Sequence, residues 1–365
     1  MKKFILAVLS GILTLPGFCC TSVIISGKVT SDGRPLMLKH RDTSHLDNAV
    51  GYFRGPRFTF IGLVNASTAF SGEVWTGTNE AGFSIMNTAS YNIKDDDLPE
   101  SEMDKEGILM YQALGICEKL SDFEHLLDTL PRPLGVEANF GVIDAHGGAA
   151  YYEVNNHSWI KYDVNVMESG YRVVTNFSES GRREDDKGYE RYVTASEIFS
   201  ELLAEKPYQV KHGDIFNGIS RSYRNRERGK VYVIPRNITS ASLVLEGVRP
   251  GENPLHTVMW TILGYPPCSV AVPLLVGNGC LLPSYVMPGD EGHSEWCDLA
   301  KEMKEKNLDL RPACWKAEQR IDALFGEIYG NWLSGELSDP NFFRNYAQIR
   351  SSFLRIYKEE FIKND

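Results

Sequence analysis

The order in which strand-like and helix-like segments follow one another constrains the fold of this 365-residue chain more than any other feature. Runs rich in β-branched and aromatic residues come first, and we predict strands at 21–30, 36–41, 52–64 and 74–88. Apolar residues at helical spacing follow in 106–130, with a break near Ser121, which is a candidate N-cap. A single helix or a pair of helices is therefore expected after the first group of strands.

The rest of the chain returns to strand patterns and ends in helices. We predict further strands at 138–144, 149–155, 171–176, 231–235, 240–245, 257–263 and 270–276. We predict helices at 189–204, 295–306, 314–332 and 341–362. The last of these helices carries an aromatic stripe, which we interpret as core packing. This order predicts an α+β fold, a layered sandwich in which helices cover two sheets.

A hairpin near the start of the chain brings polar residues together. The Asp-Gly pair in the segment 31–35 is a strong turn signal, and it joins the strand at 21–30 to the strand at 36–41. The returning strand carries the sequence KHRD at 39–42 back toward the start of the first strand. We therefore expect side chains of 39–42 to lie near Cys20.

The first 19 residues have the pattern of a secretion signal. Two lysines precede an apolar run, 4–15, which is too short to span a bilayer. Gly17 and Cys19 are the small residues that a cut before Cys20 requires. We predict a signal peptide at 1–19 that is removed, and a secreted or periplasmic mature protein. A lipid anchor on a cysteine and a retained helix are the alternatives, and the residues before the cut fit a lipoprotein signal poorly.

Composition excludes several classes of protein. The net charge is −10 without a basic patch, so we expect no nucleic-acid partner. Beyond the leader there is no apolar run of about 18 residues, so we expect no stable membrane insertion. The sequence has no CxxC, no HExxH and no zinc spacing, so neither a metal nor a cofactor is predicted. Cys297 with Cys314 and Cys268 with Cys280 are candidate disulfides, but we favour buried thiols.

A cysteine that becomes the first residue has the means to activate itself. Reference pKa values are about 8.5 for the thiol and about 7.7–8.0 for an α-amine. The amine can therefore take the thiol proton as Cys20 attacks, and no histidine is required. The acyl intermediate then needs an oxyanion hole made of backbone N–H groups or asparagine side chains. A carboxylate near the amine would orient it.

Several short stretches, in order, resemble the N-terminal-nucleophile (Ntn) hydrolases that cleave linear amides. These comprise the choloylglycine hydrolase and penicillin V acylase group and the acyl-CoA:6-aminopenicillanic acid acyltransferase group. The matching stretches are CTS at 20–22, KHRDT at 39–43, GTNEAGF at 77–83, NFGVIDA at 139–145, VVTN at 173–176 and ERY at 190–192. Each stretch is short, but their order behind a cysteine exposed by export is specific.

The resemblance implies a role for each matching residue. Cys20 would be the nucleophile and its amine the base, and Asp42 would orient that amine. Asn87 would contribute to the oxyanion hole, Asn176 would lie near the amine, and Arg191 would be a charge partner. Asn79, in the turn of the third stretch, is interpreted as a structural turn residue.

Residues 39–42 depart from the bile-salt hydrolases, which carry Arg-Asn-x-Asp there. Either Lys39 replaces that arginine or Arg41 reaches in from a neighbouring position, and we include Lys39, His40 and Arg41 as candidate substrate-binding residues. The resemblance also implies a four-layer αββα sandwich for 20–287. The helical segment 288–365 has no counterpart in the family and is expected to pack on the same domain.

The expected function is that of an exported cysteine-nucleophile hydrolase or acyltransferase acting on a small N-acyl amide. A Ser-His-Asp or Cys-His hydrolase is disfavoured, because the chain has no GxSxG elbow and no histidine in a context that singles it out. A non-catalytic binding protein, secreted or lipid-anchored, is the alternative. The identity of the acyl amide, the choice between hydrolysis and transfer, and a homo-oligomeric state stay open.

Overall fold

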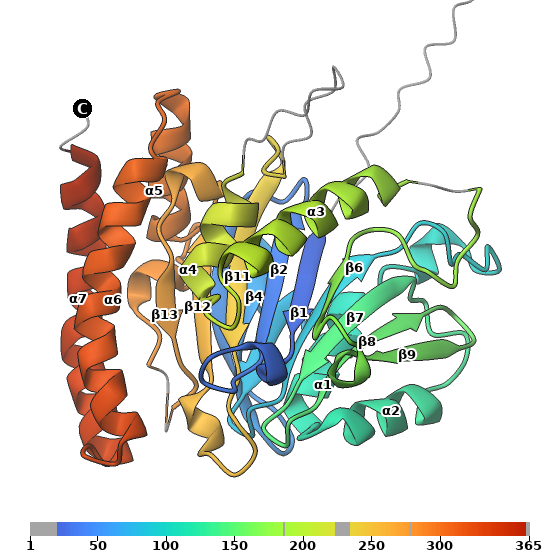
Figure 1. Cartoon of the computed structure of the whole chain (residues 1–365). Helices are drawn as coiled ribbons and strands as arrows, with labels where there is room; N and C mark the ends of the chain where they lie inside the picture. Colours follow the sequence, from blue (N-terminus) through green and yellow to red (C-terminus); the bar gives the residue numbers. More distant parts are fainter. Residues whose placement is uncertain (1–19, 185–186, 223–233, 278, 280, 363–365) are drawn as a thin grey trace, which may run out of the picture.

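The computed structural model describes residues 20–184, 187–222, 234–277, 279 and 281–362 (Figure 1). The predicted signal peptide at 1–19 lies outside the described residues, and so does most of the predicted strand at 231–235. Within the described residues the chain forms two antiparallel sheets with helices on their outer faces. The α+β prediction is therefore confirmed.

The first sheet has six strands in the order β10-β1-β2-β11-β12-β13. Their bounds are β1 Thr21–Ile25, β2 Leu36–Asp42, β10 Tyr171–Val174, β11 Thr239–Glu246, β12 Val258–Leu263 and β13 Val272–Leu274. β1 and β2 are the arms of the predicted hairpin, and every residue of both is buried. They are buried on two sides because the second sheet covers one face of the first sheet and helices cover the other.

The second sheet has seven strands in sequence order, β3 to β9. Their bounds are β3 Asn48–Arg54, β4 Thr59–Asn65, β5 Thr76–Asn79, β6 Ser84–Ala89, β7 Ala138–Ile143, β8 Ala149–Val154 and β9 Trp159–Asp163. Ile24 and Met37 of the first sheet share an apolar cluster with Met86 and Tyr151 of the second. The Tyr151 hydroxyl also donates to Ser22 Oγ at 3.1 Å, so the two sheets pack face to face.

Helices cover both outer faces, which completes the four layers (Figure 1). Their bounds are α1 Glu106–Ile116, α2 Leu120–Thr129, α3 Tyr189–Glu205, α4 His212–Ile215, α5 Glu295–Glu305, α6 Arg311–Leu333 and α7 Asp339–Ile362. α1 and α2 pack on the second sheet through Leu109 and Phe123, among others. α3 and α4 pack on the first sheet, where Phe199 and Ile215 enter its core. This is the αββα arrangement that the resemblance implied.

The C-terminal helices are continuous with the core of the first sheet. The aromatic stripe of α7 is buried there, which confirms its interpretation as core packing. Arg221, just after α4, pairs with Glu318 of α6 through contacts of 2.8 and 2.5 Å. Glu318 also accepts from the Ala271 N–H at 2.7 Å, and the Tyr346 hydroxyl donates to Pro273 O at 2.7 Å. The helices are thus bonded to the segment that carries β13.

Some local predictions were wrong. The segment 52–64 forms parts of two strands, not one, because the chain turns at Gly55–Phe58, where Gly55 N donates to Phe58 O at 3.0 Å. Pro56 in this turn has no N–H for a sheet ladder. Neither β9 nor α4 was predicted. α2 begins at Leu120, so Ser121 lies inside the helix and not at its cap.

The cysteines agree with the interpretation as buried thiols. Within the described residues Cys20, Cys117, Cys268, Cys297 and Cys314 are all free and buried. The candidate disulfide between Cys297 and Cys314 is therefore wrong, and the other candidate involves Cys280, which lies outside the described residues. None of the described helices is both long enough and apolar enough to cross a bilayer.

Candidate active site

Strand register determines which side chains lie around Cys20. Thr21 lies opposite His40 on β2, and Ser22 lies opposite Val174 on β10. Continuing both registers to the residue before β1 brings Cys20 opposite Arg41 on one side and Asn176 on the other. Directly opposed residues share a face of the sheet, and neighbours along a strand alternate between faces. The first sheet therefore presents two sets of polar side chains at this end.

Lys39 and Asn87 form a pair on the inner face, which looks toward the second sheet. The Lys39 ammonium donates to the main-chain oxygen of Asn87 and, at 2.9 Å, to its side-chain Oδ1. Lys39 is only 2% exposed. Burial lowers the pKa of Lys39, while the charge of Cys20 and a hydrogen bond to it act in the opposite direction. The ammonium is therefore adjacent to the Cys20 side chain.

The same pair orients the Asn87 amide. Because Oδ1 accepts from the ammonium, Nδ2 is turned away from Lys39, a cation that cannot accept a hydrogen bond. Among the described residues, Nδ2 donates to no acceptor. Asn87 therefore keeps an amide N–H beside Cys20 that can stabilise an oxyanion.

Arg41 is the second cation on the inner face. Its guanidinium donates to Asn48 Oδ1 and, at 2.8 Å, to Asn65 Oδ1, and it stacks over Trp75 at 4.8 Å from the ring centre. Burial lowers the pKa of Arg41 to about 9, and the charge of Cys20 opposes this shift. These neighbours of Arg41 were not predicted from the sequence.

Asp42 and Arg191 pair on the outer face, beneath α3. Arg191 Nη2 donates to Asp42 Oδ2 at 2.8 Å, and Arg191 Nη1 donates to Thr21 Oγ1 at 2.9 Å. Asp42 Oδ1 accepts from Thr239 Oγ1 at 2.5 Å. Burial raises the pKa of Asp42, and Arg191 is the first of the groups that oppose this rise. The pair thus binds the residue that follows Cys20.

His40 belongs to the outer face as well. It is completely buried, and its Nε2 lies 3.4 Å from Thr239 Oγ1 and 3.7 Å from Asp42 Oδ1. Burial lowers the pKa of His40 to about 3, so the ring is neutral. The strand alternation separates His40 from Lys39 and Arg41, the other two candidate substrate-binding residues.

Asn176 follows β10 and is fully buried. Its Nδ2 donates to Ala89 O at 2.7 Å, while Oδ1 has no partner among the described residues. The extended register sets Asn176 opposite Cys20. An unused, buried acceptor at this position suits the N–H groups of a free α-amine.

Asn79, in the third of the matching stretches, has a structural role. Asn79 Nδ2 donates to Leu114 O and Cys117 O, and its Oδ1 accepts from the N–H groups of Ala81 and Phe83. Every polar atom of this amide is satisfied. Its interpretation as a turn residue is confirmed.

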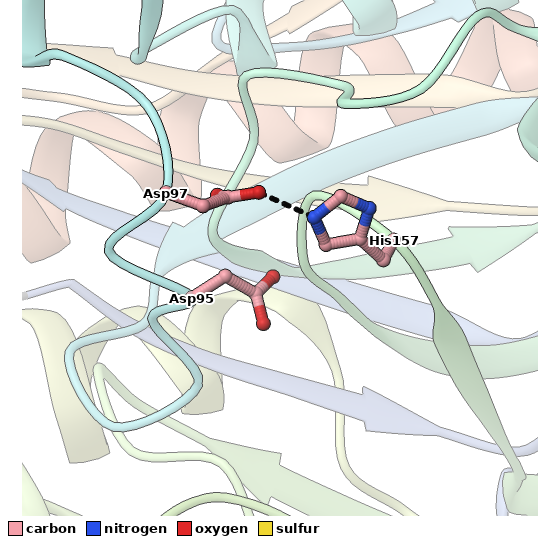
Figure 2. A group of neighbouring side chains, drawn as sticks. All are labelled: Asp95, Asp97 and His157. Atoms are coloured by element: carbon pink, nitrogen blue, oxygen red, sulfur yellow. Dashed lines mark hydrogen bonds and ion pairs between the residues drawn. The ribbon is translucent and has the colours of Figure 1, made fainter.

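Asp95, Asp97 and His157 are the one group with metal-ligand chemistry found among the described residues (Figure 2). Their ligand atoms lie within 4.8 Å of one another, and Figure 2 shows Asp97 directed at the His157 ring. The carboxylates already accept from Asn155 Nδ2 at 3.1 Å and from Asn156 Nδ2 at 2.7 Å. The group is exposed and fastens the loop after β6 to the β8–β9 turn, so we interpret it as a tether.

A cavity of about 530 Å³ lies at the edge of the first sheet, between β10 and α3. Its walls include Val174, Phe177 and Tyr192, but not Cys20. The site is therefore defined by the side chains around the thiol, and the shape of this cavity does not define a substrate.

No protein-family model matches the sequence, and no curated protein matches it. Similar solved structures include the Caenorhabditis elegans ortholog of N-acylethanolamine-hydrolyzing acid amidase, with a TM-score of 0.45, 16% identity, and coverage of 62% of this chain and 92% of that chain. A mutant conjugated bile acid hydrolase from Clostridium perfringens has a TM-score of 0.45, 10% identity, and coverage of 70% and 92%. Penicillin V acylase from Agrobacterium tumefaciens has a TM-score of 0.42, 12% identity, and coverage of 70% and 86%.

The latter two are the kinds of protein that the sequence motifs resemble. At such low identity and TM-score, the similarity does not determine an activity for this chain. We therefore derive the function from the side chains of the site.

Proposed function

We propose that this chain is an exported cysteine-nucleophile amidohydrolase or acyltransferase, which cleaves the linear amide C–N bond of a small N-acyl substrate. One observation carries the proposal: Lys39 fixes the Asn87 amide beside Cys20 and leaves its Nδ2 free to donate. Acyl transfer requires at least a nucleophile and an oxyanion donor that can reach the same carbonyl group.

The reaction follows from these groups. After removal of residues 1–19, the α-amine of Cys20 accepts the thiol proton, and the thiolate attacks the substrate carbonyl carbon. The oxygen that becomes negative accepts from Asn87 Nδ2. The protonated amine then gives its proton to the leaving nitrogen, the C–N bond breaks, and an acyl thioester remains on Cys20. Water, or an acceptor amine in a transferase, attacks the thioester and restores the thiol.

Groups on both faces of the first sheet support the base in this proposal, with Asn176 on the face of Cys20 and the pair of Asp42 and Arg191 on the other. Asn176 Oδ1 accepts an N–H of the α-amine, which holds the nitrogen lone pair toward the thiol. The ion pair of Asp42 and Arg191 holds Thr21, and with it the start of β1. We regard Asp42 and Arg191 as positioning residues, because both Asp42 oxygens are already engaged.

Intact mass and N-terminal sequencing of the exported protein test the first requirement. The expected mature chain starts at Cys20 and releases amine from a panel of N-acyl amides. Cys20→Ser should lose this activity, while Cys117→Ala, which removes a buried thiol elsewhere, should retain it. Full activity of Cys20→Ser would exclude the mechanism. A chain with an uncleaved or lipidated Cys20 and no turnover would instead support a binding protein.

A further inference from the structure

β10 is an edge strand of the first sheet, and β1 is its one neighbour among the described strands. The Ser26 N–H donates to Gly170 O at 2.8 Å, in continuation of the register between β1 and β10. Hydrogen-bonded and non-hydrogen-bonded pairs alternate along an antiparallel ladder. Arg172 and Val174 therefore bond to β1, whereas the main-chain N–H and C=O of Val173 point away from it.

The outward main-chain groups on either side of Val173 are already engaged. Tyr171 O accepts from Ser169 Oγ at 2.9 Å, and Thr175 O accepts from Thr88 Oγ1 at 2.7 Å. The outward groups of Val173 have no such partner in the part of the chain that the structure describes, although this residue is only 5% exposed. Buried backbone groups are nearly always hydrogen-bonded in native proteins. The N–H and C=O of Val173 are therefore available to an external partner.

Arg172 contributes a polar wall on the inner face of the sheet, where it approaches Glu153 of β8. Its guanidinium donates to Glu179 at 2.7 Å and stacks over the Tyr162 ring at 4.0 Å from the ring centre. Its Nε is buried and has no partner among the described residues. Because side chains alternate along a strand, the neighbouring Val173 directs its side chain to the outer face, toward α3.

The cavity of about 530 Å³ reaches this open position. Val173 and Val174 both line it, and these two side chains point to opposite faces of the sheet. The cavity therefore passes around the edge of β10. Its aromatic wall consists of Phe177 and of Tyr189 and Tyr192 from α3, whose rings contact one another with centroids 5.3 and 6.0 Å apart.

We propose that this cavity is a peptide-binding site, in which an extended segment pairs antiparallel with Val173 as a seventh strand of the first sheet. One residue of the peptide exchanges both main-chain hydrogen bonds with Val173 and shares its face of the sheet. The side chain of that residue therefore lies against the aromatic wall, and the two flanking side chains point toward the face of Arg172. The occupant is an extended peptide with an aromatic residue between two neutral polar ones, bound by strand addition. The site is separate from Cys20, so the inference does not depend on the proposed function.

A short peptide, acetyl-Gln-Phe-Gln methylamide, tests the site by isothermal titration. Binding needs no turnover, so the mature Cys20→Ser protein is used and the peptide stays intact. We expect saturable one-to-one binding at millimolar or lower concentrations. Methylation of the Phe nitrogen removes the donor to Val173 O and should weaken binding roughly threefold to tenfold, the usual effect of losing one neutral hydrogen bond. Methylation of the first Gln nitrogen, which points away from β10, should leave binding unchanged. Absence of saturable binding, or equal binding of the two methylated peptides, would overturn the inference.

Val173→Pro makes the matching change in the protein. Proline lacks the N–H, and it is tolerated on an edge strand where that N–H does not bond to the neighbouring strand. We expect this variant to keep the β1 ladder and to bind the peptide at least about threefold more weakly. Val173→Thr, which has the same shape and keeps the N–H, should bind as the unchanged protein does.

Tyr189→Ala tests the aromatic wall without altering the strand. The Tyr189 side chain is 45% exposed, so we expect the variant to fold and to bind the peptide more weakly. Phe70→Ala removes an exposed ring outside the cavity and should leave binding unchanged. Unchanged affinity in both Val173→Pro and Tyr189→Ala would overturn the inference.

Analytical ultracentrifugation distinguishes a peptide from a second copy of this chain as the occupant. We expect the mature protein and Val173→Pro to sediment with the same mass. A dimer that dissociates in Val173→Pro would show that β10 pairs with β10 of another copy, and it would overturn the peptide site.

Discussion

The Lys39 ammonium donates hydrogen bonds to two oxygens of Asn87, one from the main chain and one from the side chain. The contact joins β2 of the first sheet to β6 of the second at the position of Cys20. It decides which end of the Asn87 amide faces the thiol, because an ammonium group accepts no hydrogen bond. In the proposed mechanism, a lysine on a neighbouring strand thus orients the oxyanion donor without touching the substrate.

Loss of the Asn87 donor should slow the reaction without unfolding the protein. We expect Asn87→Ala to lower kcat by about 10²–10³, the usual effect of removing one oxyanion-hole donor. Asn87→Asp is the sharper variant, because its carboxylate still accepts from Lys39 but has no N–H. Asn87→Ala should retain the wild-type rate of Cys20 alkylation by iodoacetamide, because it brings no new charge to the thiol. A wild-type kcat for Asn87→Asp in steady-state kinetics would show that Asn87 does not contribute to the oxyanion hole.

The free amine of Cys20 is the second requirement that can be tested alone. One extra alanine before Cys20 converts the amine into an amide, which cannot accept the thiol proton at neutral pH. We expect the extended protein to fold normally and to release no amine from substrates cleaved by the mature form. Enzymatic removal of the alanine should restore the rate. An active extended protein would show that another group, such as Lys39, serves as the base.

Turn signals and strand patterns in the sequence were enough to predict the parts of the candidate site that lie along single strands. The Asp-Gly turn predicted the hairpin of β1 and β2, and therefore the approach of 39–42 to Cys20. Alternation along β2, once the sheet is known, separates Lys39 and Arg41 from His40 and Asp42. The sequence could not supply the register, so all four residues were grouped together at first.

The remaining site residues could not be found from local sequence. Asn48, Asn65 and Trp75 approach Arg41 only because two sheets pack face to face, and Thr239 reaches Asp42 from a strand almost 200 positions away. No turn or periodicity marks them. Conversely, the turn at Gly55–Phe58 was missed because β-branched and aromatic residues continue on both sides of it. Pairing across sheets is decided by burial of whole faces, and a short window does not contain that information.

Titration of His212 should make the free energy of unfolding depend on pH. Burial disfavours its charged form, but the carboxylates of Asp322 and Glu246, 3.4 and 3.8 Å from its ring nitrogens, outweigh burial and raise the pKa of His212 to about 9. The folded value lies above the unfolded value of about 6.5. The stabilisation of the folded state by protonated His212 is therefore complete below about pH 6.5 and is lost as the pH rises through about 9. We expect wild type to lose on the order of 2–3 kcal/mol relative to His212→Gln between pH 6 and pH 9.5.

Urea unfolding of both proteins at the two pH values measures this effect, and subtracting the unfolding free energy of the variant from that of wild type cancels most other titrations. His212→Gln keeps a polar side chain beneath Trp260, on which the His212 ring is stacked at 3.7 Å. Equal pH dependence in the two proteins would show that His212 is not held as a cation.

The C-terminal helices should be required for stability through one buried ion pair. Arg221 and Glu318 are both almost fully buried, and Glu318 also binds the Ala271 N–H. Removing one partner leaves the other charge buried and unpaired, so we expect Arg221→Met to lower the free energy of unfolding by about 3–5 kcal/mol. Lys358→Met breaks an exposed pair between α7 and Glu295 of α5 and should cost less than about 1 kcal/mol. Denaturant titration of the two variants measures both values, and equal losses would contradict a special role for the buried pair.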